Sequence, residues 1–385
     1  MIFILLVLVV LLLQLFSVLI AKKIFKDKPA LKWFLSGFIV LGLPLFLATM
    51  FFAESIPAWG ERAFAEVGFT WLILLPFLFI VLLLIFLLGA TKILPPKRNS
   101  KAFVISLFLL TGLLAYGRYN FYKIKTQGYT LNTKKTTAGN QTSNNSNTRQ
   151  EVKIIMVSDL HLGTYINKES LARFVDVINE HNPQVLFLVG DIIDRELTPL
   201  VQQQMETEFL RLKAPLGKYI VFGNHESYGK ATNEQVSDYF TKCGLTVLRD
   251  KAVLVDSLFY LVGRNDRGHT KKQRISTDDI IQNDFPNFNN SLPVVVLSHR
   301  PHTFEEWESE EPLKYTPSLV LSGHTHNGQL FPFNLIVQKL YPHYYGQFTE
   351  NGVTYITSSG LGQWGPKFRL GTQSEIVEID WNMIK

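Results

Sequence analysis

The hydrophobic and polar positions divide this chain into two parts with different patterns. The first part contains four long apolar stretches: Ile2–Ala21, Phe34–Phe52, Phe69–Ala90 and Ala102–Tyr116. The first three approach or reach the ~20 residues that a helix needs to cross a bilayer. The fourth is shorter, and the aromatic residues that continue it to Tyr122 suit a membrane interface. Buried core helices are the alternative, but a globular core does not supply four such runs in one block. The pattern therefore predicts a transmembrane helical region over residues 1–122.

From Val152 onward, short apolar runs alternate with amphipathic segments. We expect strands at Val152–Val157, Val185–Val189, Tyr219–Phe222, Val294–Leu297, Leu319–Leu321, Tyr355–Thr357 and Ile376–Ile379, and a hairpin of Ala252–Val255 with Leu258–Val262. We expect helices at Lys168–His181, capped by Asn167, at about Leu200–Leu212, and around Val236, Tyr239 and Phe240. Continuous Val, Ile and Leu runs are typical of strands that are buried on both faces. The fold class predicted for residues 151–385 is α/β, a two-sheet sandwich with flanking helices.

The segment between the two parts has a third composition. Residues 123–150 are rich in Asn, Thr, Ser and Lys, and almost no apolar residue occurs in Thr126–Gln150. Such a segment cannot bury enough surface to fold. We therefore predict a flexible linker over residues 123–150.

Charge sharpens the picture of the apolar part. Basic residues gather in the loops after the first and third stretches: Lys22, Lys23, Lys26, Lys28 and Lys32, then Lys92, Lys97, Arg98 and Lys101. The loop after the second stretch is acidic. Because basic loops stay in the cytoplasm, we expect a multi-pass integral membrane protein whose second part is extracytoplasmic. The net charge of +6 comes partly from these loops, so we expect the lipid bilayer as a partner and no nucleic acid.

The single cysteine adds little to this picture. Cys243 cannot form an internal disulfide, and it precedes Gly244 at an expected helix end. We expect it to be a small buried residue.

Metal-ligand residue types follow the predicted strands. They occur in five blocks: Asp159-Leu160-His161, Gly190-Asp191-Ile192-Ile193-Asp194, Gly223-Asn224-His225-Glu226, Ser298-His299 and Gly323-His324-Thr325-His326. Ligand sites in α/β sheets collect at the carboxyl ends of strands. A mixture of carboxylate, amide and imidazole suits divalent transition metals. A single Asp or His after a strand is more often a cap or a surface residue, but the joint occurrence of five blocks favours a metal centre.

These blocks resemble, in order, the motifs D-x-H, G-D-x-x-D, G-N-H-[DE], H and G-H-x-H of the metallophosphoesterase (calcineurin-like phosphoesterase) superfamily. All five are intact, and the resemblance covers roughly Val152 to Ile379. The tail Ser359–Pro366, with Arg369-Leu370-Gly371 and Glu375-Ile376, is similar to the membrane-anchored subgroup. The resemblance identifies residues 151–385 as a catalytic domain.

The resemblance also implies a set of ligands. Asp159, His161 and His326 would hold one divalent metal ion, Asn224, His299 and His324 a second, and Asp191 would bridge them. Imidazole ligands favour Mn, Fe or Zn over Mg. The same resemblance implies that a metal-activated hydroxide attacks phosphorus.

Four further residues have expected roles beside the metals. His225 is expected to protonate the leaving oxygen or to stabilise the charged transition state, and Glu226 to orient His225 and raise its pKa. The alternative for Glu226 is a cap of the following turn. Asp194 is expected to orient a metal ligand. Arg195 either contacts the substrate phosphate or pairs with an acid.

Two stretches near the motifs have alternative interpretations. The basic loop Arg264–Arg274 is expected to be solvated, and a rim for an anionic substrate is the alternative. The apolar segment after His326, from Phe331 to Tyr341, is expected to be core, and contact with lipid or an acyl chain is the alternative.

The sequence thus predicts a membrane-anchored phosphoesterase. A phosphodiester, from a lipid or an envelope precursor, is the expected substrate, and a phosphomonoester is the alternative. A catalytically silent scaffold or binding module on a membrane protein is the competing class, but the intact ligand set argues against it.

Overall fold

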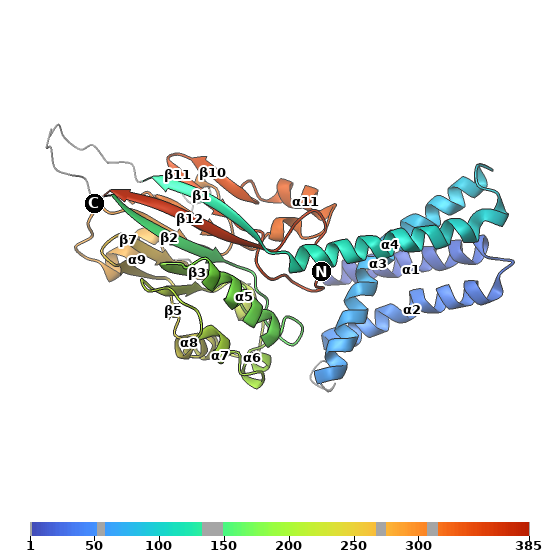
Figure 1. The fold of residues 1–385 in the computed structure, drawn as a ribbon, viewed down its shortest axis with the longest axis horizontal. Helices are drawn as coiled ribbons and strands as arrows, with labels where there is room; N and C mark the ends of the chain where they lie inside the picture. The colour runs from blue at the N-terminus through green and yellow to red at the C-terminus, as the bar shows by residue number, and fades with distance from the viewer. Residues whose placement is uncertain (1, 52–57, 133–148, 267–274, 306–314, 385) are drawn as a thin grey trace. The chain divides into compact units, whose positions relative to one another are not determined.

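The computed structural model describes residues 2–51, 58–132, 149–266, 275–305 and 315–384 (Figure 1). The chain divides into two compact units, Met1–Arg118 and Tyr119–Lys385. We call them unit 1 and unit 2.

Unit 1 is built from long apolar helices. They are α1 (Ile2–Ile24), α2 (Pro29–Phe51), α3 (Ala58–Ala90) and α4 (Asn99–Tyr122), with the short 3-10 helix η2 (Pro96–Arg98) before α4. All four stretches predicted to be membrane helices are helical over their described residues. Each α-helix is long and apolar enough to cross a membrane, and only 17–33% of each apolar window is buried. The apolar side chains therefore face mainly outward, as they do in lipid.

A hydrogen bond between helices offsets a local defect in α2. Pro44 lies inside α2 and has no N–H for the carbonyl of Val40, one turn earlier. The buried side chain of Gln14, on α1, donates from Nε2 to the carbonyl oxygens of Ile39 (2.7 Å) and Val40 (3.3 Å). A polar side chain is thus used where the backbone of a neighbouring helix lacks a donor.

Unit 2 contains two six-stranded sheets. The first has the order β1 (Lys125–Asn132), β12 (Glu375–Ile384), β2 (Arg149–Val157), β3 (Val185–Val189), β4 (Lys218–Val221) and β5 (Thr246–Val247). The second has the order β10 (Gly346–Glu350), β11 (Val353–Thr357), β9 (Leu319–Ser322), β8 (Val294–Leu297), β7 (Phe259–Gly263) and β6 (Lys251–Val255). The strands that carry the predicted ligands run parallel within each sheet: β2–β3–β4 in the first and β8–β9 in the second.

The core follows the two-residue period of the strands. In β2, Ile154 and Met156 point into a cluster that also contains Leu261 of β7 and Leu321 of β9, so this cluster fills the space between the sheets. Ile155 of the same strand points the opposite way, into a cluster with the helices. The two-sheet sandwich predicted from the sequence is therefore the observed fold.

Helices cover the outer face of each sheet. On the first sheet these are α5 (Lys168–Glu180), α6 (Thr198–Gln202), α7 (Glu206–Phe209) and α8 (Asn233–Lys242); α9 (Thr277–Asp284) covers the second. Asn167 caps α5 as predicted, accepting from the amide of Ser170. The helix expected over Leu200–Leu212 is instead two short helices. Cys243 is buried at the end of α8, as expected.

The predicted linker is wrong at both ends, since its last two residues, Arg149 and Gln150, belong to β2. Lys125–Asn132 form β1, which pairs in parallel with β12 from Lys125↔Glu375 to Asn132↔Asn382. Only Lys123 and Ile124 separate α4 from this strand, and residues 133–148 of the predicted linker lie outside the described residues. The exposed and half-exposed side chains of β1 alternate, so its composition is that of an edge strand rather than of a tether.

The apolar segment after His326 is not core. It forms α11 (Phe333–Leu340), and no residue of this helix is buried. The prediction failed because periodicity shows that a helix has an apolar face but does not show what covers that face.

Candidate metal centre

The predicted ligands lie in loops that directly follow parallel strands. Asp159 and His161 follow β2, Asp191 follows β3, Asn224 follows β4, His299 follows β8, and His324 and His326 follow β9. Since the carboxyl ends of parallel strands lie at one edge of a sheet, these loops from both sheets can meet. The structure brings the predicted residues together as neighbouring clusters of potential ligand atoms.

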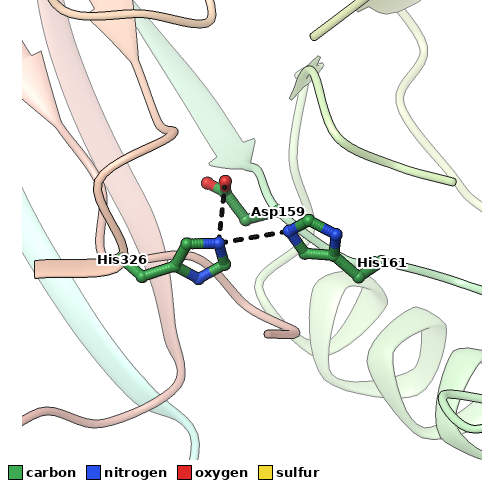
Figure 2. A group of neighbouring side chains, drawn as sticks. All are labelled: Asp159, His161 and His326. Atoms are coloured by element: carbon green, nitrogen blue, oxygen red, sulfur yellow. Dashed lines mark hydrogen bonds and ion pairs between the residues drawn. The ribbon is translucent and has the colours of Figure 1, made fainter. Parts of the chain in front are cut away.

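The first cluster contains Asp159, His161 and His326 (Figure 2). Figure 2 shows dashed lines from His326 to both of the others: its Nε2 lies 3.4 Å from Oδ1 of Asp159 and 3.1 Å from Nε2 of His161. The Nδ1 atom of His161 lies 3.4 Å from a carboxylate oxygen of Asp194. The cluster therefore offers imidazole and carboxylate atoms that converge on one point. The carboxylate of Asp194 lies beside the other nitrogen of the His161 ring.

The second cluster contains Asp191, His299 and His324. Nε2 of His299 lies 3.0 Å from Oδ2 of Asp191, and the same oxygen lies 3.9 Å from Nε2 of His161 in the first cluster. The other oxygen of Asp191 accepts from the backbone amide of His225 at 2.9 Å. The backbone thus fixes one oxygen of Asp191 and leaves the other between the two clusters.

One buried atom here fits a bound cation. Oδ1 of Asn224 is buried without a hydrogen-bond partner among the described residues. Nδ2 of Asn224 donates to the hydroxyl of Tyr228 at 3.0 Å, so this contact determines which end of the amide remains available. Buried acceptors without partners are costly unless something else binds them, and a divalent metal supplies that partner. The donor set fits the divalent ions that the resemblance implies.

The hydrogen bonds of His299 define its tautomer. Nδ1 of this ring lies 2.9 Å from the carbonyl oxygen of Val189, which can only accept. Nδ1 therefore carries the proton and donates it, and Nε2 is the nitrogen that faces Asp191. This arrangement, in which a backbone carbonyl holds the far nitrogen, is the usual support of a metal-binding histidine.

Electrostatics differ between the two histidines of the second cluster. Burial opposes a charge on His299, but the carboxylate of Asp191 outweighs it and raises the pKa of His299 to about 10. Burial, followed by the charge of His299, lowers the pKa of His324 to about 3. In the metal-free protein, Asp191 thus favours a proton on His299, and a divalent ion must displace that proton.

The structure corrects the roles predicted for Glu226 and His225. Among the described residues, Glu226 makes no hydrogen bond or ion pair with the ring of His225. Its buried carboxylate accepts from the backbone amides of Asp191, Ile192, Ile193 and Gly223, at 2.7–3.0 Å. Glu226 therefore holds the loop that presents Asp191, which is closer to the alternative of a turn cap. Burial, followed by the charge of Asp191, raises the pKa of Glu226 to about 7.

The partner of His225 is the backbone carbonyl of Asp194, which accepts from Nδ1. The pKa of His225 is lowered by burial and then by the neighbouring His161, so the predicted rise is wrong. The neutral ring has its proton on Nδ1 and a lone pair on Nε2. A ring nitrogen of His225 lies within 4.8 Å of ligand atoms of both His161 and Asp191.

The two remaining predicted residues are Asp194, which is half-buried, and Arg195. Asp194 is close to both His161 and His225, through its side chain and its backbone respectively. Arg195 is exposed, and among the described residues its side chain has no ion pair. In the basic loop, Arg264 is buried instead of solvated, Asp266 pairs with Arg300, and residues 267–274 lie outside the described part of the chain.

The backbone of the site is strained. Five of the seven predicted ligands have a positive φ, between 49° and 70°: Asp159, His161, Asp191, His324 and His326. This left-handed conformation is unfavourable for residues with a Cβ atom, although Asp and His tolerate it better than most. Such strain gathers where the surrounding structure holds functional groups in place.

The glycines before the ligands provide room for them. A Cβ atom on Gly223 would lie 2.2 Å from Oδ1 of Asp191, and one on Gly190 would lie 2.6 Å from Nδ1 of His299. Gly190 also has a φ of +75°. Any side chain here would push a ligand away, which explains the glycine in both blocks.

Sequence reasoning missed three residues that support the site. Tyr228 binds the amide of Asn224, and the hydroxyl of Tyr341 lies 3.2 Å from Nε2 of His324. The side chain of Arg369 is fully buried and donates to the carbonyl oxygens of Ser359, Gly360 and Gly362, which form the loop beside Asp159. Burial lowers the pKa of Arg369 to about 10. Only Arg369 had a signal in the sequence, as part of the tail typical of the subgroup.

Comparisons with known proteins point to the family that the five motifs resemble. The family model described as calcineurin-like phosphoesterase matches residues 152–328. A protein of Aquifex aeolicus named "Uncharacterized metallophosphoesterase" is 30% identical over 281 residues, which cover 71% of this chain and 97% of that protein. A Helicobacter pylori protein with the same name is 29% identical over 231 residues, 60% of each chain.

The name of a further relative describes it as a transmembrane protein. The Danio rerio "Transmembrane protein with metallophosphoesterase domain" is 28% identical over 236 residues, which cover 59% of this chain and 52% of that protein. The match thus spans about half to three fifths of the fish and Helicobacter pylori proteins, and nearly all of the Aquifex aeolicus protein.

Proposed function

Because the chain belongs to the metallophosphoesterase family, we propose that it is a membrane-anchored, metal-dependent hydrolase of a phosphoester bond. One observation carries this proposal. Oδ2 of Asp191 lies 3.0 Å from Nε2 of His299 in one cluster and 3.9 Å from Nε2 of His161 in the other. A carboxylate between two ligand clusters is what a pair of metal ions needs as a shared ligand.

In this proposal, Asp159, His161 and His326 hold one divalent ion, and Asn224, His299 and His324 hold the other. Asp191 binds both. The mixture of imidazole and oxygen ligands favours Mn, Fe or Zn. When bound, the two ions supply an activated water and neutralise the charge on the phosphoryl oxygens.

The proposed task of His225 is to give a proton to the leaving oxygen. The carbonyl of Asp194 holds Nδ1 of His225 and leaves Nε2 to exchange a proton. Its lowered pKa keeps the free ring neutral, and an anionic phosphate nearby would raise that pKa and favour the protonated acid. Glu226 contributes by holding the Asp191 loop, and Tyr228 by orienting the amide of Asn224.

The substrate proposal is a phosphodiester, with a phosphomonoester as the second candidate. The test is a rate panel with bis(p-nitrophenyl) phosphate, p-nitrophenyl phosphate and lipid pyrophosphates, on the full chain reconstituted with Mn, Fe or Zn. Metal-dependent turnover of at least one ester is expected, and the ratio of the first two rates distinguishes diesterase from monoesterase. A protein that binds two metal ions and turns over no ester would be a silent binding module instead.

We place unit 2 outside the cytoplasm, on the basis of the basic loops before α2 and before α4. Cysteines introduced at Ser100 and at Asn290, an exposed residue of unit 2, test this orientation in intact cells. An impermeant maleimide should label position 290 and spare position 100. Cys243, the only native cysteine, is buried and should give little background. Labelling of position 100 alone would put the chemistry in the cytoplasm.

A further inference from the structure

The helix α11 has an apolar surface that nothing in the described part of unit 2 covers. Its large side chains are half or more exposed: Phe333 56%, Leu335 50%, Ile336 52% and Leu340 67%, with Phe331 at 51% just before the helix. We call these five residues the α11 face. Helices this short are not stable by themselves in water, so the helix depends on its surroundings.

The α11 face is held beside the metal centre at both ends. On its N-terminal side, the 3-10 helix η4 (His326–Gly328) begins with a predicted metal ligand, and four residues separate it from α11. On its C-terminal side, Tyr341 ends the helix, and its hydroxyl lies 3.2 Å from Nε2 of His324. Whatever binds the α11 face is therefore brought next to both histidines of the last motif.

The α11 face is also close to the point where unit 2 continues from α4. Within unit 2, Nδ2 of Asn120, in the last turn of α4, donates to the carbonyl of Arg369 at 3.2 Å. The amide of Phe331 donates to the carbonyl of the next residue, Leu370, at 2.8 Å. The last turn of an apolar, membrane-length helix and the first residue of the α11 face thus bind adjacent residues of one loop.

The charges around the α11 face fit a lipid surface. No acidic residue occurs between His326 and Glu350, and the exposed Lys339 lies within the helix. The exposed Trp364 is close by, since its carbonyl accepts from Gln329 at 2.9 Å. Phe, Leu and Trp beside a basic side chain are the composition of helices that lie in the headgroup region of a bilayer.

We propose that the α11 face docks on the bilayer that anchors the chain, so that the metal centre acts on phosphoesters of lipids at the headgroup level. The substrate half of this statement rests on the proposed function. The docking half does not depend on it, and the two are tested separately.

Docking is tested with the full chain in vesicles of phosphatidylcholine and phosphatidylglycerol. An environment-sensitive fluorophore is attached to a cysteine at Ile336 or, as the matched control, at Leu210. Leu210 is 57% exposed and follows α7, which covers the first sheet. Lipids with a quencher in the acyl chain should remove most of the fluorescence at position 336 and little at position 210. Equal quenching at both positions overturns the docking. So does fluorescence at position 336 that is protected from both water and the lipid quencher, because a second copy would then cover the face.

The substrate class is tested with Ile336→Gln and Leu340→Gln against Leu210→Gln. The measured quantity is the rate on phosphatidylglycerol in the vesicles divided by the rate on bis(p-nitrophenyl) phosphate in solution, since both are phosphodiesters. Each α11 substitution should lower this ratio about ten-fold, since a large apolar side chain leaves the lipid. The control should leave it unchanged. A ratio that does not fall overturns the lipid substrate, whereas a wild-type protein inactive on both diesters overturns the proposed phosphodiesterase instead.

Discussion

The two units place the same kinds of residue in opposite environments. In unit 1, large apolar side chains such as Leu15, Leu41 and Leu84 are more than half exposed, and the buried polar residues among the described ones are uncharged: Gln14, Ser17 and Ser36. In unit 2, apolar strands are buried, and charged groups such as Asp159, Asp191 and Arg369 are buried with them. Unit 1 therefore suits an apolar solvent, whereas unit 2 buries charged groups and offsets their electrostatic cost with ligands and hydrogen bonds.

The largest effect should come from the buried charge between the two clusters. Asp191→Asn should abolish measurable turnover and lower metal content at both positions, because its free oxygen faces ligands of both. Metal analysis and rate measurement on the purified chain check this. Asp256→Asn, at an exposed carboxylate, is the control and should change neither. An active Asp191 variant with two ions per chain would refute the shared-ligand assignment.

The second effect distinguishes a residue that transfers a proton, His225, from the residues that bind metal. His225→Ala should keep both metal ions but lose about 10²–10⁴-fold in rate, the usual contribution of acid catalysis. The loss should be smallest for esters of good leaving groups such as p-nitrophenol, which need no proton. An equal loss on good and poor leaving groups would leave His225 only a role in charge stabilisation.

The third effect is a pH dependence of the apparent metal affinity, which arises from the buried charges of unit 2. With the pKa of His299 near 10, a metal ion must displace a proton, so apparent affinity should rise about ten-fold per pH unit from pH 7 to 9. In the metal-stripped protein, the raised pKa stabilises the fold fully below the ordinary histidine pKa, and this contribution is lost as the pH rises through about 10. Calorimetric titrations with Zn or Mn at several pH values measure the first quantity. A flat affinity would show that Asp191 does not hold the proton on His299.

The smallest effect tests the polar contact of unit 1. Gln14→Leu removes the donor to the carbonyls of Ile39 and Val40, and should cost about 0.5–2 kcal/mol, the range for hydrogen bonds between membrane helices. Thermal unfolding of the full chain in detergent measures the loss. Leu15→Ala, at an outward-facing position next to it, should change the midpoint less. If both substitutions act equally, the Gln14 contact has no special role.

The sequence predicted those features that local pattern encodes. Runs of Val, Ile and Leu that end at Asp191 or His299 identified both the strands and the edge where the ligands meet. The polar strand β1 was missed because its partner Glu375–Asn382 lies far along the chain, and no local pattern reports that pairing. The role of Glu226 was missed for a related reason: its carboxylate binds the amides of a loop that is distant in sequence. The exposure of α11 could not be predicted from the sequence, because it depends on how the rest of the fold packs around this helix.

The pairing of β1 also sets an order of events during synthesis. Lys125 of β1 pairs with Glu375 of β12, and β12 separates β1 from β2, so the first strand of unit 2 to leave the ribosome has no partner until the last one is made. At about 5–20 residues per second, the intervening chain takes roughly 10–50 s to translate. During this interval an apolar strand would risk pairing with a neighbouring chain. The residues of β1, whose composition resembles that of a linker, are polar. An unpaired strand of this composition stays soluble in water during this interval and does not aggregate.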